Sequence, residues 1–330
     1  MKILKNILFS LAIIIIIFSL VEFSAKIVNP LLKLSHGNAG LMIGGKDALE
    51  YPAGYIKDRD LFWKLESNKH GYNSFGMRDR EFSRTKTDGT YRIICMGDSV
   101  TFGWPTPPEE TYPKILEKIL NTKSINLKYE VLNAGVPGYT SYQGLKFLEK
   151  DILSYNPDLI VVYFGINDMG LSIRPDKDQK PLPYWVINAA NLLRKFNSFK
   201  LINKISLYSR FPPDKQYSVS RVSQDDFGYN LKKIKKIAYS YGIKVVFIIN
   251  PAFYDPERKI IIAKKGYSPQ ALNPSLDIYT LFKKRENEAP NIFLDDCRPL
   301  NFHLKVYGQR VLAEAVFDLL VKDRIIEFKN

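Results

Sequence analysis

Ser99 is the residue of this chain whose type and position are best suited to chemistry. It follows the apolar segment Tyr91–Met96 and stands in the sequence Gly97-Asp98-Ser99. In an open α/β sheet, ligands bind beyond the carboxyl ends of the strands, so a serine there has its hydroxyl at the mouth of a crevice. Its backbone N–H would lie near a helix start, which suits a nucleophile that needs a nearby oxyanion donor. Turns also favour these three residue types, so the motif by itself leaves a plain turn as the alternative.

Two later segments repeat this pattern of an apolar strand that runs into a glycine-rich loop. Val131–Ala134 leads into Gly135, and Leu159–Phe164 leads into a Gly-x-Asn-Asp sequence that contains Asn167. Together with the Ser99 segment, they resemble the first three sequence blocks of the SGNH, or GDSL, hydrolases. The resemblance implies that the Gly135 N–H and the Asn167 side-chain amide join the Ser99 N–H in an oxyanion hole. Such donors stabilise the charged oxygen of a tetrahedral intermediate, and losing one costs about 100- to 1000-fold in rate.

His303 is the expected general base. The chain has 3 histidines, and the other two, His36 and His70, precede the repeated strands and loops. His303 comes shortly before Gln309–Val316, which has helical periodicity. This layout resembles the last block of the family, a loop histidine followed by a glycine and the closing helix. In the logic of a catalytic triad, His303 takes the proton of Ser99 and later protonates the leaving group.

The acid that would orient His303 is less well defined. The family places an aspartate three residues before the histidine, and here that position is Leu300. The nearest acids, Asp296 and Asp295, follow the short apolar segment Asn291–Leu294. We predict that Asp296 is the acid, with Asp295 as the alternate. A dyad without an acid, or an impaired enzyme, stays open at this point.

The elements that would position these residues alternate along the chain. From Tyr91 onward, short apolar segments alternate with helical patterns, which is typical of a parallel sheet with helices on both faces. Further strands are expected at Ile243–Ile249 and at Ile292–Leu294. Ser223 is expected to cap the intervening helix, with Asp226 at its third position. The resemblance implies the SGNH hydrolase fold, a three-layer α/β/α domain with a flavodoxin-like, parallel five-stranded sheet.

The N-terminus has a different composition from the rest of the chain. Ile7–Val21 carries no charge before Glu22, and with its flanks it approaches the roughly 20 residues that cross a bilayer. Lys2 and Lys5 precede it, which favours a cytoplasmic N-terminus. We predict that residues 1–27 form an uncleaved signal anchor of a single-pass membrane protein, with the catalytic domain on the periplasmic side or the cell surface. A cleaved signal peptide is the alternative.

Two further parts follow the anchor, and the second of them contains an insertion. Residues 28–89 are expected to be a juxtamembrane extension that packs on the domain, because a pure linker would contain fewer aromatic residues. Residues 90–330 are expected to form the hydrolase domain. Within it, an insertion at about 170–221 has apolar residues and lysines at helical spacing, as in a helix that caps a domain or lies on a membrane. We predict that this insertion acts as a substrate-selecting lid.

The composition of the chain argues against several other classes of function. The chain has 330 residues, 45% hydrophobic and 25% charged, with a net charge of +14. Attraction to an anionic surface would explain that charge, but we attribute most of it to a lysine-rich composition. No basic stripe interleaved with aromatic residues suggests nucleic-acid binding. No Cys/His spacing suggests a metal site, no cofactor is expected, and Cys95 is expected to be a buried thiol.

These observations favour a serine esterase or acylhydrolase that acts on an O-acyl ester. An acetyl or short acyl group on a cell-envelope glycan is the first expected substrate, and a lysophospholipid or other lipid ester is the second. Transfer of the acyl group to a polysaccharide begins with the same acyl-enzyme, and exclusion of water would decide between transfer and hydrolysis. A catalytically silent glycan-binding or assembly protein is the alternative from a different class.

Overall fold

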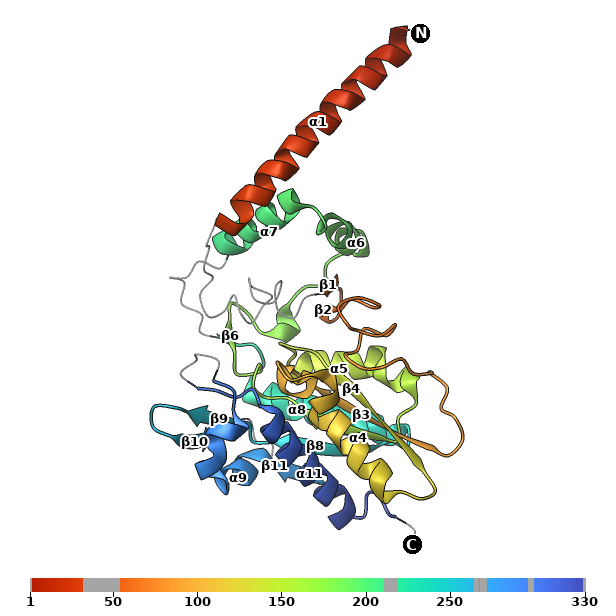
Figure 1. The fold of residues 1–330 in the computed structure, drawn as a ribbon, viewed down its shortest axis with the longest axis vertical. Helices are drawn as coiled ribbons and strands as arrows, with labels where there is room; N and C mark the ends of the chain where they lie inside the picture. The colour runs from red at the N-terminus through yellow and green to blue at the C-terminus, as the bar shows by residue number, and fades with distance from the viewer. Residues whose placement is uncertain are drawn as a thin grey trace.

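The chain is described by a computed structural model, which covers residues 2–31, 54–210, 219–263, 267, 272–295 and 300–328. Its centre is a parallel five-stranded sheet with the strand order β11-β8-β5-β3-β4 (Figure 1). In chain order the strands are β3 (Thr90–Gly97), β4 (Lys128–Gly135), β5 (Leu159–Tyr163), β8 (Lys244–Ile249) and β11 (Ser275–Asp277). The order is 2-1-3-4-5 when these strands are counted along the chain, which confirms the flavodoxin-like sheet.

The fifth strand is not the predicted one. Ile292 ends the short helix α10 (Ala289–Ile292), and Phe293 makes only an isolated antiparallel bridge with Leu304. The edge of the sheet is instead β11, in which Ser275 pairs with Phe247 of β8. The prediction of a strand at Ile292–Leu294 was therefore wrong, because the apolar side chains there pack into the core from a helix end rather than from the sheet.

Helices cover both faces of the sheet. Residues of α4, α9, α10 and α11 pack in one buried cluster, and residues of α5 and α8 pack in the other. Strand β3 alternates between the clusters, with Ile93 and Cys95 on one face and Ile94 and Met96 on the other. The helices are α4 (Tyr112–Lys123), α5 (Ser141–Lys150), α8 (Gln224–Ser240), α9 (Ile278–Lys283) and α11 (Val306–Lys322). Ser223 caps α8, as predicted, by accepting a hydrogen bond from the Asp226 N–H.

The N-terminal helix α1 (Lys2–Leu31) extends away from this domain (Figure 1). Within the described residues it is the one helix long and apolar enough to cross a membrane, over Leu4–Asn29. The insertion supplies α6 (Tyr184–Leu193), α7 (Asn197–Arg210) and the short antiparallel pair β6 (Leu171–Ser172) and β7 (Val219–Ser220).

Helix α7 packs beside α1. The Glu22 carboxylate accepts hydrogen bonds from the N–H of Asn197 (2.7 Å) and of Ser198 (2.8 Å) at the start of α7. The rings of Phe18 and Phe196 meet edge to face with centroids 5.3 Å apart. The insertion therefore contacts the membrane-length helix.

The extension ahead of the sheet forms the antiparallel pair β1 (Tyr55–Asp58) and β2 (Phe62–Leu65), here called the β1–β2 hairpin. Helix α6 contacts it through Asn191, whose side chain exchanges hydrogen bonds with the backbone of Lys57. A second small pair, β9 (Ala252–Asp255) and β10 (Ile260–Ala263), lies near α9. The hairpin brings an N-terminal segment against the domain (Figure 1).

Candidate active site

Ser99 lies at the carboxyl end of β3, where the sequence analysis placed it. Strand β3 ends at Gly97, and Ser99 begins the one-turn helix α3 (Ser99–Phe102). The Asp98 side chain caps this turn by accepting a hydrogen bond from the Val100 N–H at 2.9 Å. Gly103 closes the turn with a φ of 82°, a left-handed conformation that favours glycine. The strand and the tight turn together set the direction of the serine hydroxyl.

His303 meets Ser99 across 204 positions of the chain. The distance between the His303 Nε2 and the Ser99 Oγ is 2.9 Å, which is a hydrogen bond. Both side chains are nearly buried, with 3% and 7% of their surfaces exposed. His303 precedes α11, as predicted, and its carbonyl accepts a hydrogen bond from the Leu294 N–H at 2.8 Å. The structure thus brings together the predicted nucleophile and base.

The predicted acid is a residue that the structure does not describe. Asp296 lies outside the described residues, and Asp295 is an exposed residue. The hydrogen bond between Leu294 and His303 places the chain that leads to both aspartates beside the histidine. Asp296 therefore stays a prediction, with Asp295 as its alternate.

Asn167 follows β5 and faces the turn that bears the serine. Its Nδ2 donates to the Tyr139 carbonyl at 3.1 Å and approaches an Asp98 carboxylate oxygen at 3.3 Å. The neighbouring Asp168 accepts hydrogen bonds from the Ser141 N–H (2.9 Å) and hydroxyl (2.5 Å), which tie the Asn167 loop to the start of α5. The amide is thus held between the loops that follow β3, β4 and β5.

Gly135 lies at the end of β4, where it packs closely against α3. Its N–H donates to the Asn133 Oδ1 at 3.0 Å, so this proton is already used inside β4. A Cβ at this position would lie 2.2 Å from the Phe102 backbone nitrogen, which means that only glycine lets α3 approach β4 so closely. In this conformation the hydrogen bond engages the N–H that was predicted to be an oxyanion donor, and the close approach of α3 accounts for a glycine at this position.

Gly138, three residues further on, is the donor candidate that the sequence analysis missed. In the part of the chain that the structure describes, its N–H makes no hydrogen bond. Gly138 has a φ of 82°, and the Tyr139 N–H donates to the Val136 carbonyl at 3.1 Å. These features define a type II β-turn with Pro137 and Gly138 at its centre. A Pro-Gly pair is a sequence signal for this turn and would have pointed to Gly138 as a second candidate.

Burial raises the pKa of the acids around the nucleophile. The pKa of Asp98 is raised to about 7, first because its carboxyl is buried and also because Asp168 is negatively charged. The hydrogen bond from Val100 acts in the opposite direction. Burial likewise raises the pKa of Asp168 to about 6, against the hydrogen bonds from Ser141. The floor of the site therefore holds carboxyl groups whose charge changes near neutral pH.

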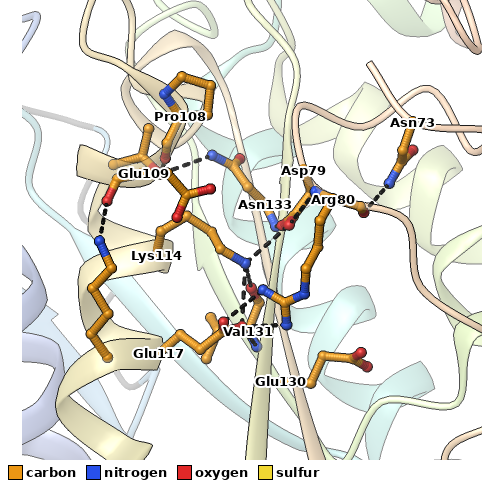
Figure 2. Close-up of polar contacts among 12 residues, drawn as sticks. Asn73, Asp79, Arg80, Pro108, Glu109, Lys114, Glu117, Glu130, Val131 and Asn133 are labelled. Carbon is orange, nitrogen blue, oxygen red and sulfur yellow. Dashed lines mark hydrogen bonds and ion pairs between the residues drawn. The ribbon is translucent and has the colours of Figure 1, made fainter. Parts of the chain in front are cut away.

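The carboxyl end of β4 is held from the N-terminal extension (Figure 2). Asp79 accepts a hydrogen bond from the Asn133 N–H at 2.7 Å and pairs with the buried Lys114 at 2.9 Å. Lys114 also donates to the Val131 carbonyl at 2.9 Å. Asn133 in turn holds Gly135, so the extension fixes the strand end on which the loop is built.

The flavodoxin-like sheet and the Ser99–His303 pair at its carboxyl edge are the features expected of the SGNH, or GDSL, hydrolases. The model of the GDSL-like Lipase/Acylhydrolase family matches residues 95–311, and the chain belongs to this family. An arylesterase from Vibrio mimicus is 28% identical over 131 residues, which are 38% of this chain and 60% of that protein.

Two solved structures resemble the chain more distantly. The lipase/acylhydrolase from Enterococcus faecalis is 19% identical, with a TM-score of 0.45, over 73% of this chain and 99% of that one. The acetylxylan esterase Axe2 from Geobacillus stearothermophilus is 15% identical, with a TM-score of 0.42, over 70% of this chain and 94% of that one.

Proposed function

We propose that Ser99 is the nucleophile and His303 the general base of an esterase that works through an acyl-enzyme. The observation that carries this proposal is the 2.9 Å contact between the Ser99 Oγ and the His303 Nε2 at the carboxyl end of the sheet. The histidine accepts the hydroxyl proton as the oxygen attacks the ester carbonyl, and it then protonates the leaving alcohol. Water attacks the acyl-enzyme in the second half of the reaction, with the same histidine as base.

We propose that Asp296 orients His303, with Asp295 in reserve. The backbone hydrogen bond from Leu294 to His303 supports this assignment, because the next residues along the chain are the two aspartates. A carboxylate on the Nδ1 side would hold the ring in the tautomer that leaves Nε2 free to accept the serine proton.

The proposed oxyanion hole consists of the Ser99 N–H, the Gly138 N–H and the Asn167 amide. The Gly138 N–H replaces that of Gly135 because it makes no hydrogen bond to a described residue. The Asn167 amide donates to the Tyr139 carbonyl at 3.1 Å and to Asp98 at 3.3 Å, and the longer of these two hydrogen bonds is the one that a substrate oxygen would replace. Three donors converging on one oxygen would stabilise the tetrahedral intermediate.

The substrate that we propose is an O-acyl ester with a short acyl group, such as an acetyl group on a cell-envelope glycan. A nucleophile of which 7% is exposed favours a small acyl group over a long chain. The apolar α1 supports attachment to a membrane. Lys2 and Lys5 ahead of it support a domain on the outer side. The lid role of the insertion stays a prediction. The insertion begins and ends beside Asn167, because the Gly170 N–H donates to the Asn167 carbonyl and the N–H of Val222, which follows the insertion, donates to the Asp168 carbonyl.

Hydrolysis of p-nitrophenyl acetate by the full chain in detergent tests the proposal, with Ser99→Ala as the comparison. We expect the variant to lose at least about 1000-fold in kcat. A fluorophosphonate probe should label the wild-type chain and not the variant, and His303→Ala should abolish labelling as well. Equal hydrolysis by the wild-type chain and Ser99→Ala would refute the assignment. Comparing acetyl with longer acyl esters then tests the preference for a short chain.

A further inference from the structure

The peptide unit between Pro137 and Gly138 is held from the N-terminal extension. Its carbonyl, on Pro137, accepts hydrogen bonds from the Trp63 indole N–H at 3.2 Å and from the Tyr55 hydroxyl at 3.4 Å. Both donors belong to the β1–β2 hairpin. In a trans peptide the C=O and the N–H point in opposite directions. Because the carbonyl points to the hairpin, the Gly138 N–H points away from it.

The direction of this peptide is the feature that distinguishes two kinds of turn. Type I and type II turns differ chiefly by a rotation of the central peptide, and glycine at the third position tolerates either. In a type I turn the Pro137 carbonyl would swing away from Trp63 and the Gly138 N–H would reverse. The hydrogen bonds from the hairpin therefore favour the type II form that the structure shows, with a φ of 82° at Gly138.

The chain that follows this peptide is also held, by the hairpin and by Arg221. The Tyr139 hydroxyl donates to the Trp63 carbonyl at 2.7 Å. The buried Arg221 guanidinium donates to the Gly138 carbonyl at 2.8 Å and lies over the Trp63 ring, 5.6 Å from a ring centroid. Asp176 pairs with that guanidinium at 2.9 Å. The Trp63 ring lies against Gly138, since a Cβ there would be 3.0 Å from its Cζ2.

We propose that Trp63, assisted by Tyr55, is a positioning residue that sets the oxyanion-hole peptide in its productive direction. The inference rests on the proposed function, in which the Gly138 N–H binds the substrate oxyanion. Both residues precede the segment 95–311 that matches the family model. The β1–β2 hairpin thus positions part of the active site, although neither residue touches the reacting atoms.

Trp63→Phe in the full chain tests this role, because phenylalanine keeps a ring against Gly138 and removes the N–H donor. We expect kcat for p-nitrophenyl acetate to fall about 10- to 100-fold, which approaches the loss of one oxyanion donor. KM should change less than threefold, because the donor acts on the oxyanion rather than on the bound ester. Affinity for a trifluoromethyl ketone, which forms a tetrahedral oxyanion on the serine, should fall in parallel with kcat/KM. Trp185→Phe, in the exposed part of α6, is the matched control and should leave all these values unchanged.

Tyr55→Phe supplies a second and milder variant should Trp63→Phe not fold. It should lower kcat by a smaller factor, and the double variant should exceed either single change. A folded Trp63→Phe with kcat/KM and ketone affinity within twofold of wild type would overturn the positioning role and leave the proposed function intact. Loss that appears only in KM, or an equal loss in Trp185→Phe, would also overturn it. A wild-type chain that hydrolyses no ester through Ser99 would overturn both.

Discussion

Replacing Gly135 by alanine separates the two roles that have been considered for this glycine. An alanine keeps the backbone N–H, so an oxyanion donor would survive the change. The added Cβ would lie 2.2 Å from the Phe102 nitrogen and 2.6 Å from the Thr101 carbonyl carbon. These are backbone atoms of α3, which also bears Ser99, and they have no rotamer by which to move aside.

The size of the effect follows from these distances. Carbon atoms pack favourably at about 3.5–4.0 Å, so α3 must shift by about 1 Å away from β4. Overpacking of this kind costs about 1–3 kcal/mol, and contact with backbone puts Gly135→Ala in the upper part of that range. In a chain of this size the loss corresponds to a fall in Tm of about 5–10 °C. A shift of about 1 Å between nucleophile and base costs on the order of 100-fold in rate.

Thermal unfolding and p-nitrophenyl acetate hydrolysis, measured on the same preparations, check this prediction. Gly228→Ala in α8 is the matched control, because no atom lies within 4 Å of its added Cβ. That control should keep its activity and gain up to about 1 kcal/mol from helix propensity. If Gly135→Ala kept the wild-type Tm within 1 °C and its activity within about twofold, the packing argument would be refuted.

Three further predictions concern groups outside the catalytic pair. Because burial raises the pKa of Asp98 from 3.8 to about 7, its contribution to stability is greatest below pH 4 and is lost as the pH rises to 7. The free energy of unfolding of wild type relative to Asp98→Asn should therefore fall by up to about 4 kcal/mol over that range in urea titrations, and a constant difference would contradict the shift. Burial raises the pKa of the Cys95 thiol to about 12. In a Cys297→Ser variant, Ellman's reagent should therefore modify Cys95 only after unfolding. Rapid reaction of the native protein would contradict this prediction. Ser223→Ala should lose about 1 kcal/mol of stability by urea unfolding with little change in kcat, whereas Ser223→Asp should retain the cap.

The sequence predicts those parts of the site that depend on strand order. Ser99 and Asn167 lie at the ends of apolar strands that alternate with helices, and the parallel sheet brings those ends to one edge. His303 could be placed because the chain has few histidines and this one precedes the closing helix. The hydrogen bond from the Gly135 N–H to Asn133 could not be predicted, because it is a contact with a side chain inside a strand, which apolar patterning does not reveal.

The edge strand escaped prediction for a related reason. Strand β11 has three residues, of which only Leu276 is apolar, and pairing with β8 rather than composition makes it a strand. The more apolar Ile292–Leu294 had the stronger sequence signal but ends a helix. The Trp63 contact joins positions 74 residues apart, and nothing in the spacing of the sequence relates them.

The contact of Glu22 with the start of α7 bears on how far the enzyme can reach. Helix α1 contacts the start of α7, and α6, which precedes α7, contacts the β1–β2 hairpin. Helix α1 is therefore joined to the domain by these contacts as well as by the covalent chain. A domain attached to the membrane at one point can rotate freely about that point, whereas a domain attached at two points keeps a fixed height and orientation. With the uncharged segment Ile7–Val21 in a bilayer, Glu22 would lie at the lipid surface, and such a brace would confine the esterase to acyl groups within a narrow layer above the lipid. Ester substrates would then be selected according to their distance from the membrane as well as their chemistry.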